Sequence, residues 1–133
     1  VGPVELIKFV ERIRDPFNLN SLALVAAEAA LKDTLFVKKT IALNNKGMSF
    51  WERGLEKAGV PFWKSDGNFI LIDTGRGFGC DGVEVFQRCL QKGVIFRPVH
   101  NYGLKNCLRI SVGTPEENKV ALKVLLKAGG RST

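Results

Sequence analysis

The sequence has few of the residues on which metal and disulfide chemistry depends. Its 133 residues include three cysteines, Cys80, Cys89 and Cys107, and a single histidine, His100. The cysteines lack the Cys-x-x-Cys spacing of zinc and redox sites, and their odd number argues against a disulfide framework. With one histidine, no metal site is expected. The sequence therefore predicts reduced, mostly buried thiols in a cytoplasmic protein.

Long apolar runs are also missing. No segment reaches the ~18 apolar residues of a membrane-spanning helix, and no basic-then-apolar leader opens the chain, so no membrane partner is expected. Apolar residues make up 45% of the chain and charged residues 25%, as in a globular domain. The chain starts at Val1 and its only methionine is Met48, so we expect a fragment, a processed chain or the ordered part of a larger one.

The chain has a strong excess of positive charge, +7 at pH 7. Such an excess occurs in proteins that bind nucleic acids. The basic residues are scattered, however, and only Lys38 and Lys39 are adjacent, so no nucleic-acid partner is expected. The favoured explanation is a site for acidic small molecules, combined with the uneven charge of a fragment.

Helical periodicity dominates the first half of the chain. Asn20 or Ser21 can cap the second helix of this half. Gly47 and Gly54 weaken the third and longest helix, so it is expected either to continue through them or to break at one of them. The expected helices cover residues 4–13, 20–31 and 33–58.

After Pro61 the pattern changes to short apolar strands that alternate with helices. Asp81 with Glu84, and Thr114 with Glu117, have the spacing of helix capping boxes. The glycine-rich segment "TGRGFGCDG", which directly follows the first expected strand, is expected to be a loop without regular structure. The expected strands cover 68–73, 94–96 and 107–112, and the expected helices cover 83–91 and 115–127.

These elements predict an α+β fold, of the α/β three-layer kind, with β-α-β-β-α order in the second half. We expect a helical segment over 1–60 and a small α/β domain over 61–133. The three strands should lie in one sheet. Helices 82–92 and 115–127 should cover one face of it, because each must bury its apolar stripe.

Two arginines are associated with the predicted strands. Arg109 stands between Leu108 and Ile110, so it points to the opposite face of the sheet from these neighbours. Arg97 closes the apolar run "GVIF" and precedes Pro98. Each could be a solvated edge residue, a structural ion-pair partner or an anion binder. A guanidinium matches a carboxylate or phosphate with two parallel hydrogen bonds, so two such residues on neighbouring strands could share one acidic ligand.

Other polar residues give weaker signals. Asn68 opens the first strand and could point into a cleft, but a turn asparagine is equally expected. The glycine-rich 75–79 lacks the spacing and the lysine of a phosphate loop. His100 has no serine or cysteine motif beside it, which predicts a solvated loop histidine. The residues alone therefore indicate an α+β domain with two candidate anion-binding arginines.

Four segments occur together in a known enzyme family: "RDPFNLNSLALVAAEAAL", "SDGNFILIDTG", "GVIFRPV" and "YGLKNCLRISVGTPEEN". By their order and intervals the chain resembles the histidinol-phosphate aminotransferases. The resemblance extends from Val4 to about Leu126. The run from Tyr102 to Asn118 is similar, almost letter for letter, to the C-terminal signature of that family.

The resemblance implies a fold-type I enzyme that uses pyridoxal 5'-phosphate, usually a cytoplasmic homodimer of histidine biosynthesis. Such enzymes exchange an amino group between glutamate (or 2-oxoglutarate) and imidazole-acetol phosphate (or histidinol phosphate). Arg109 and Arg97 match the arginines that bind the acidic ends of the substrates in this family, and Asn68 and Tyr102 are further candidates for lining the site. The chain would then be the small C-terminal domain with the helices that lead into it.

The lysine that forms the imine with the cofactor has no counterpart in this sequence. In the family it lies in a Ser-x-[Ser/Thr]-Lys segment followed by "LAGLRIGY", which should precede Val1. The segments "VKKT" and "FWKS" do not fit this pattern. We therefore expect no catalytic residue here, no covalent cofactor binding and no activity of the chain alone, because the chemistry needs the imine and a partner for the ring nitrogen.

Two alternatives stay open. One is another class I/II pyridoxal-phosphate enzyme, an aromatic aminotransferase or a threonine-phosphate decarboxylase. The other is an isolated anion- or nucleic-acid-binding module, since the β-α-β-β-α order is similar to that of RNA-binding ferredoxin-like domains. Those domains stack bases on aromatic residues of their central strands, and "CLRISV" has none, which counts against this alternative.

Overall fold

The computed structural model describes residues 2–15 and 18–131, and it divides into two compact units, Val1–Lys38 and Lys39–Thr133. The first unit contains helices α1 (Val4–Arg12) and α2 (Ser21–Lys32) and the start of α3 (Thr34–Lys57). The side chain of Asn20 caps α2 by accepting a hydrogen bond from the Ala23 amide at 2.8 Å. The three helices match the expected ranges closely. None of the residues of α1 and α2 is buried.

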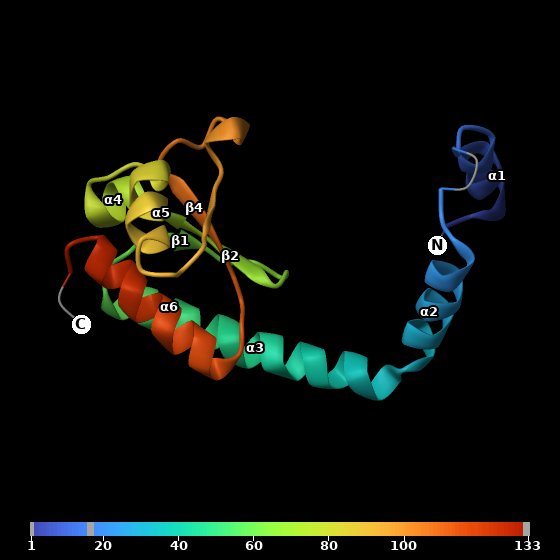
Figure 1. Ribbon diagram of the computed structural model, residues 1–133, viewed down its shortest axis with the longest axis horizontal. Helices are drawn as coiled ribbons and strands as arrows, with labels where there is room; N and C mark the ends of the chain where they lie inside the picture. Colours follow the sequence, from blue (N-terminus) through green and yellow to red (C-terminus); the bar gives the residue numbers. More distant parts are fainter. Residues whose placement is uncertain (1, 16–17, 132–133) are drawn as a thin grey trace. The chain divides into compact units, whose positions relative to one another are not determined.

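The second unit is built on an antiparallel sheet of four strands in the order β1-β2-β4-β3 (Figure 1). Two of the three expected segments, 68–73 and 107–112, pair in this sheet, the third strand follows the apolar run 94–96 instead of containing it, and β1 adds a short strand that the sequence pattern did not predict. The strands are β1 (Phe62–Trp63), β2 (Phe69–Asp73), β3 (Arg97–Pro98) and β4 (Cys107–Ser111). The remaining elements are α4 (Thr74–Phe78), α5 (Gly82–Leu90), the 3-10 turn η1 (His100–Tyr102) and α6 (Pro115–Ala128).

Helices cover one face of this sheet, as expected. The covered face carries the fully buried side chains of β2 and β4, and side chains from α3, α5 and α6 pack against them. Val85 of α5 and Leu125 of α6 belong to this one core, which confirms that both helices lie on the same face. The core is formed chiefly by Met48, Trp51, Leu55, Ile70, Ile72, Val85, Cys89, Leu108, Ile110 and Leu125.

Helix α3 continues without a break through both of its internal glycines. A Cβ at Gly47 would overlap the side chain of Val112, and a Cβ at Gly54 would overlap Leu122 of α6. The glycines therefore allow α3 to approach α6 and the end of β4 closely. Because its C-terminal half belongs to the core, the compact unit begins at Lys39, earlier than the domain boundary expected near residue 60.

The glycine-rich segment after β2 was expected to be a loop, and this prediction is wrong. Thr74–Phe78 forms α4. The carboxylate of Asp73 accepts a hydrogen bond from the Arg76 amide at 2.9 Å, and Gly79 closes the helix with φ of 70°. Caps at both ends thus stabilise a turn of helix whose own residues have low helix propensity.

The prediction of a strand over 94–96 is also wrong, since β3 contains only Arg97 and Pro98. The amide of Val94 instead donates to the carbonyl of Cys89 and closes the end of α5. Phe96 is buried edge-on against Trp51, with ring centroids 6.4 Å apart. Of the apolar run before Arg97, Phe96 thus belongs to the core, whereas Ile95 is 76% exposed, and the strand begins only at Arg97.

Both predicted capping residues are N-caps. Thr114 and Glu117 form the complete reciprocal box at the start of α6. The hydrogen bond from the Thr114 amide, followed by that from its side chain, lowers the pKa of Glu117. Asp81 accepts from the Glu84 amide at 2.8 Å, but the Glu84 carboxylate pairs with Arg88 at 2.5 Å instead of completing a box.

The three cysteines are free thiols. Burial raises the pKa of Cys89 to about 11. The pKa of Cys107 is raised by burial and, to a smaller extent, by the negative charge of Asp73. Both thiols are therefore poor nucleophiles at neutral pH. Over the described residues, no helix is both long enough and apolar enough to cross a membrane.

The start of α5 lies directly against β4, and this contact leads to a prediction. A Cβ at Gly82 would overlap the backbone carbonyl oxygen of Cys107, and the Gly82 amide donates to the Lys105 carbonyl at 3.0 Å. We expect Gly82→Ala to lower the free energy of unfolding by about 2–3 kcal/mol, because the strand must shift to admit the methyl group. Urea denaturation measures this loss.

Gly93→Ala is the matched control. Gly93 has φ of 77°, but nothing lies within 4 Å of its Cβ position. That change should cost only the strain of the left-handed backbone, about 1 kcal/mol. Equal losses for the two variants would contradict the proposed contact between α5 and β4.

Candidate functional site

The uncovered face of the sheet holds both candidate arginines. Arg97 of β3 and Arg109 of β4 are direct cross-strand partners. The pairing continues from Arg109 to Leu71 of β2 and from Leu71 to Trp63 of β1. Because paired residues point to the same face, these four side chains form one row across the sheet. The folding of the sheet thus places the two guanidinium groups on adjacent strands.

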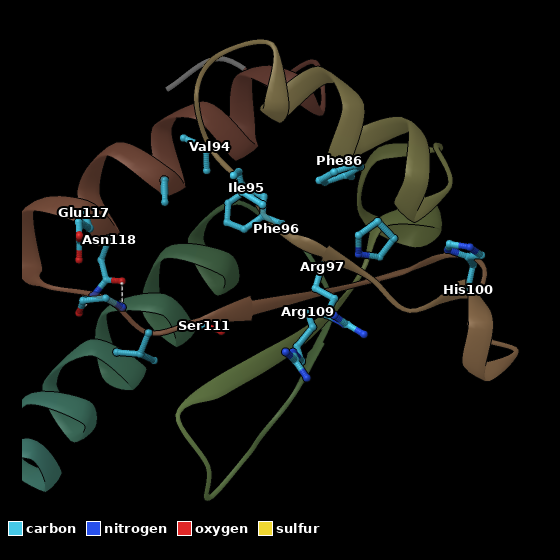
Figure 2. Close-up of a pocket in the computed structure, with 14 residues that line it drawn as sticks. Phe86, Val94, Ile95, Phe96, Arg97, His100, Arg109, Ser111, Glu117 and Asn118 are labelled. Carbon is cyan, nitrogen blue, oxygen red and sulfur yellow. Dashed lines mark hydrogen bonds between the residues drawn. The ribbon is translucent and has the colours of Figure 1, made fainter. Parts of the chain in front are cut away.

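The two arginines line a cavity of about 560 Å³. Their side chains extend in the same direction from neighbouring strands (Figure 2). The rest of the lining comes from α5, from the segment before β3, from Pro98 of β3 and His100 of η1, and from the end of β4 with the first half of α6. It includes Phe86, Phe96, His100, Ser111, Glu117 and Asn118.

The electrostatics of this pair favour an anion. Neither guanidinium takes part in an ion pair among the described residues, and the buried Nε of Arg109 has no hydrogen-bond partner there. The Arg109 guanidinium lies over the ring of Phe69, 5.2 Å from its centroid. Like charges on directly opposed residues destabilise a sheet. A bound carboxylate or phosphate would offset the repulsion between the two positive charges and accept hydrogen bonds from both guanidinium groups.

Asn118 fixes the wall of the cavity near the start of α6 (Figure 2). Its buried side chain accepts hydrogen bonds from the indole N–H of Trp51 and from the Gly113 amide, both at 2.9 Å. It also donates to the Gly113 carbonyl at 2.9 Å. One amide therefore joins α3, the loop after β4 and α6, and holds the end of the strand that carries Arg109.

The other predicted site residues lie elsewhere. Asn68 lines a second cavity, of about 540 Å³, and its carbonyl accepts from the Val112 amide at 2.8 Å. Tyr102 is exposed in η1 and does not belong to the lining of the arginine cavity. His100 is exposed, as expected of a loop histidine, yet it does line that cavity.

Sequence reasoning did not single out Ser111, Glu117 and Asn118 as cavity residues. All three lie in the signature-like run "CLRISVGTPEEN", where only the arginine and the helix cap were noticed. That run is also the connection from β4 to α6. Residues that follow a strand bearing a candidate ligand-binding side chain are close to the site for geometric reasons, and this signal could have identified them.

The described lining of the arginine cavity does not fit a covalently held pyridoxal phosphate, the cofactor implied by the resemblance. It contains no lysine for an imine and no aspartate or tyrosine for the cofactor ring. It does contain two cationic groups suited to the acidic ends of a substrate. Within residues 2–15 and 18–131, no group of three or more histidine, cysteine or acidic side chains could hold a metal ion.

Comparison with known proteins gives a consistent result. The family model for aminotransferase class I and II matches residues 1–125. A histidinol-phosphate aminotransferase of Bdellovibrio bacteriovorus is 41% identical over 125 residues, which is 94% of this chain and 32% of the relative. Histidinol-phosphate aminotransferase 2 of Methylococcus capsulatus is 47% identical over 117 residues, 88% of this chain and 30% of the relative. The chain thus spans about a third of the length of these relatives.

Solved structures share the fold. The histidinol-phosphate aminotransferase of Clostridium acetobutylicum matches with a TM-score of 0.82 at 22% identity, over 95% of this chain and 38% of that one. The histidinol-phosphate aminotransferase of Sinorhizobium meliloti, in complex with pyridoxal-5'-phosphate, matches with a TM-score of 0.77 at 22% identity, over 92% of this chain and 33% of that one. These matches confirm the expected α+β fold class.

Proposed function

Because this chain belongs to the aminotransferase class I and II family, we propose that it is the C-terminal part of a histidinol-phosphate aminotransferase. The complete enzyme transfers an amino group between glutamate and imidazole-acetol phosphate in histidine biosynthesis, as a cytoplasmic homodimer. Support comes from relatives of that name at 41% and 47% identity and from the coverage of about a third of their length.

The role proposed for this chain is to bind the acidic ends of both substrates through Arg109 and Arg97. The observation that carries this role is the pair itself: two guanidinium groups on directly opposed residues, with no acidic partner among the described residues. The phosphate of one substrate and the side-chain carboxylate of the other present similar anions, so one pair can serve each in turn. A rigid strand holds Arg109 in place and limits its loss of side-chain entropy on binding.

The first unit supports the proposal of a longer protein. Large apolar side chains of α1 and α2 are exposed, among them Leu6 at 57%, Phe9 at 63%, Leu22 at 83% and Val25 at 67%. Exposed apolar patches of this kind mark surfaces that another protein segment covers. We propose that the rest of the enzyme, or its second subunit, covers them.

Pyridoxal phosphate, when bound to the complete enzyme, supplies the electron sink for the amino transfer. We expect the 133-residue chain alone to form no imine with it, because no lysine is among the described residues that line the arginine cavity. Adding the cofactor should give no absorbance band in the ~410–430 nm region that borohydride removes. Such a band, traced by mass spectrometry to a lysine of this chain, would contradict this prediction.

The proposed activity is tested on the complete enzyme with a panel of substrates. Glutamate should support amination of imidazole-acetol phosphate with the highest kcat/KM of the panel. Phenylpyruvate tests the aromatic aminotransferase alternative, and threonine phosphate tests the decarboxylase alternative. A higher kcat/KM with either of these, or tight nucleic-acid binding without any transamination, would overturn the proposed function.

A further inference from the structure

Helix α6 lies beside the C-terminal half of α3 (Figure 1). A groove follows the line between the two helices. Two adjoining cavities, of about 390 Å³ and 90 Å³, share Phe50 and Lys119 and together form it. The α3 residues that line it recur at intervals of three and four, which places them on one helix face. They are Leu43, Lys46, Gly47, Phe50, Gly54 and Lys57; Ala58, directly after the end of α3, also lines the groove.

The floor of this α3–α6 groove is apolar. Phe50, Leu122 and Leu126 are partly buried and pack on the core from its outer side. Leu43 continues the apolar strip toward the start of the groove and is 42% exposed. The close contact of Gly54 with Leu122 keeps the two helices together beneath it. The result is a continuous apolar strip that the described residues leave open to solvent.

The rim of the groove is basic and uncompensated. Lys46, Lys57, Lys119 and Lys123 are exposed, and the described lining contains no aspartate or glutamate. The ion pairs found among the described residues do not involve these lysines. A lysine in the last turn of a helix stabilises the helix dipole, but among these four only Lys57 has that position. Stabilisation of a helix dipole therefore explains the position of Lys57 but not the positions of the other three lysines.

We propose that the α3–α6 groove docks an amphipathic helix with acidic flanks, supplied by a partner protein. From Leu43 to Ala58 the groove spans about 22 Å, or roughly four helical turns. An apolar stripe would fill the floor, and glutamates on either side would meet the lysines. A second copy of α1 is a poor occupant, because it carries Lys8 and Arg12 beside its acidic residues.

The test uses the 133-residue chain and a fluorescein-labelled helical peptide of about 18 residues, with leucine on one face and glutamate on the others. Fluorescence anisotropy gives its dissociation constant. Lys119→Glu/Lys123→Glu should weaken binding by about tenfold, because attraction at two rim positions becomes repulsion. Lys64→Glu/Lys105→Glu changes the net charge equally, away from the groove, and should change binding by less than about twofold.

Two further measurements exclude other occupants. A peptide of the same composition, with its leucines spread around the helix, should bind about tenfold more weakly, because its apolar stripe is lost. Equal binding of both peptides, equal losses in both double variants, or no binding of the designed peptide would overturn the proposal. Vesicles of phosphatidylserine and phosphatidylcholine should bind no more weakly to Lys119→Glu/Lys123→Glu than to the control variant. A selective loss of vesicle binding would assign the groove to a membrane surface and overturn the helix proposal.

Discussion

Arg109→Lys, in the complete enzyme, is expected to lower kcat/KM by roughly ten- to a hundredfold in both half-reactions, with glutamate and with the phosphate substrate. Lysine keeps the charge but loses the planar fork that donates two parallel hydrogen bonds. It also loses the contact of the guanidinium with the ring of Phe69. The expected loss corresponds to about 1.5–3 kcal/mol, the contribution of a charge-assisted hydrogen bond.

Arg97→Lys should impair at least the reaction of the phosphate substrate. Arg97 is the cross-strand partner of Arg109, but it is more exposed and lies on a strand of two residues, so it is held less rigidly. Its lysine variant can therefore recover part of the contact with a dianionic phosphate. Steady-state kinetics with each substrate, on preparations whose melting temperature is also measured, give the two effects separately.

A structural role for these arginines gives a different result. If they serve as ion-pair partners within the complete enzyme, the lysine variants should melt earlier and keep their kinetic constants once folded. Arg53→Lys is the matched control, because Arg53 is exposed on α3 and does not line the arginine cavity. It should leave kcat/KM within about twofold. Normal kinetics of Arg109→Lys with both substrates would rule out the anion-binding role.

Asn118→Ala is expected to cause the largest loss of stability, about 4 kcal/mol in the free energy of unfolding. The change removes three hydrogen bonds at a buried side chain. It leaves the Trp51 indole N–H and the amide and carbonyl of Gly113 without their partners, and each such group costs about 1–3 kcal/mol. Urea denaturation of the 133-residue chain measures the difference.

Two further variants show whether these hydrogen bonds cause the loss. Asn118→Asp keeps the acceptor for Trp51 but turns a carboxylate oxygen toward the Gly113 carbonyl, so it should also be destabilising. Asn101→Ala changes an exposed asparagine of η1 and should stay within about 0.5 kcal/mol of the unchanged chain. A similar small effect for Asn118→Ala would contradict the proposed role of Asn118.

Short-range signals determined much of the helical structure. Asp81 and Thr114 were identified as helix-capping residues from the sequence, and Asn20 was one of two candidates with Ser21; each of the three accepts a backbone hydrogen bond at its helix start. Capping acts over three residues and apolar periodicity over a few turns, so both are visible in the sequence. The same signals did not predict α4, because its glycines have low helix propensity and its stability depends on the caps Asp73 and Gly79.

Tertiary structure decided what the arginines can do. From the sequence, Arg97 and Arg109 could equally have been solvated or paired with acids. Only the register of β3 against β4 places them directly opposite each other on the uncovered face. Tertiary packing also limits the length of β3, because Phe96 is buried in the core beside Trp51. Strand register depends on which side chains the core can bury, and that choice involves residues far apart in the chain.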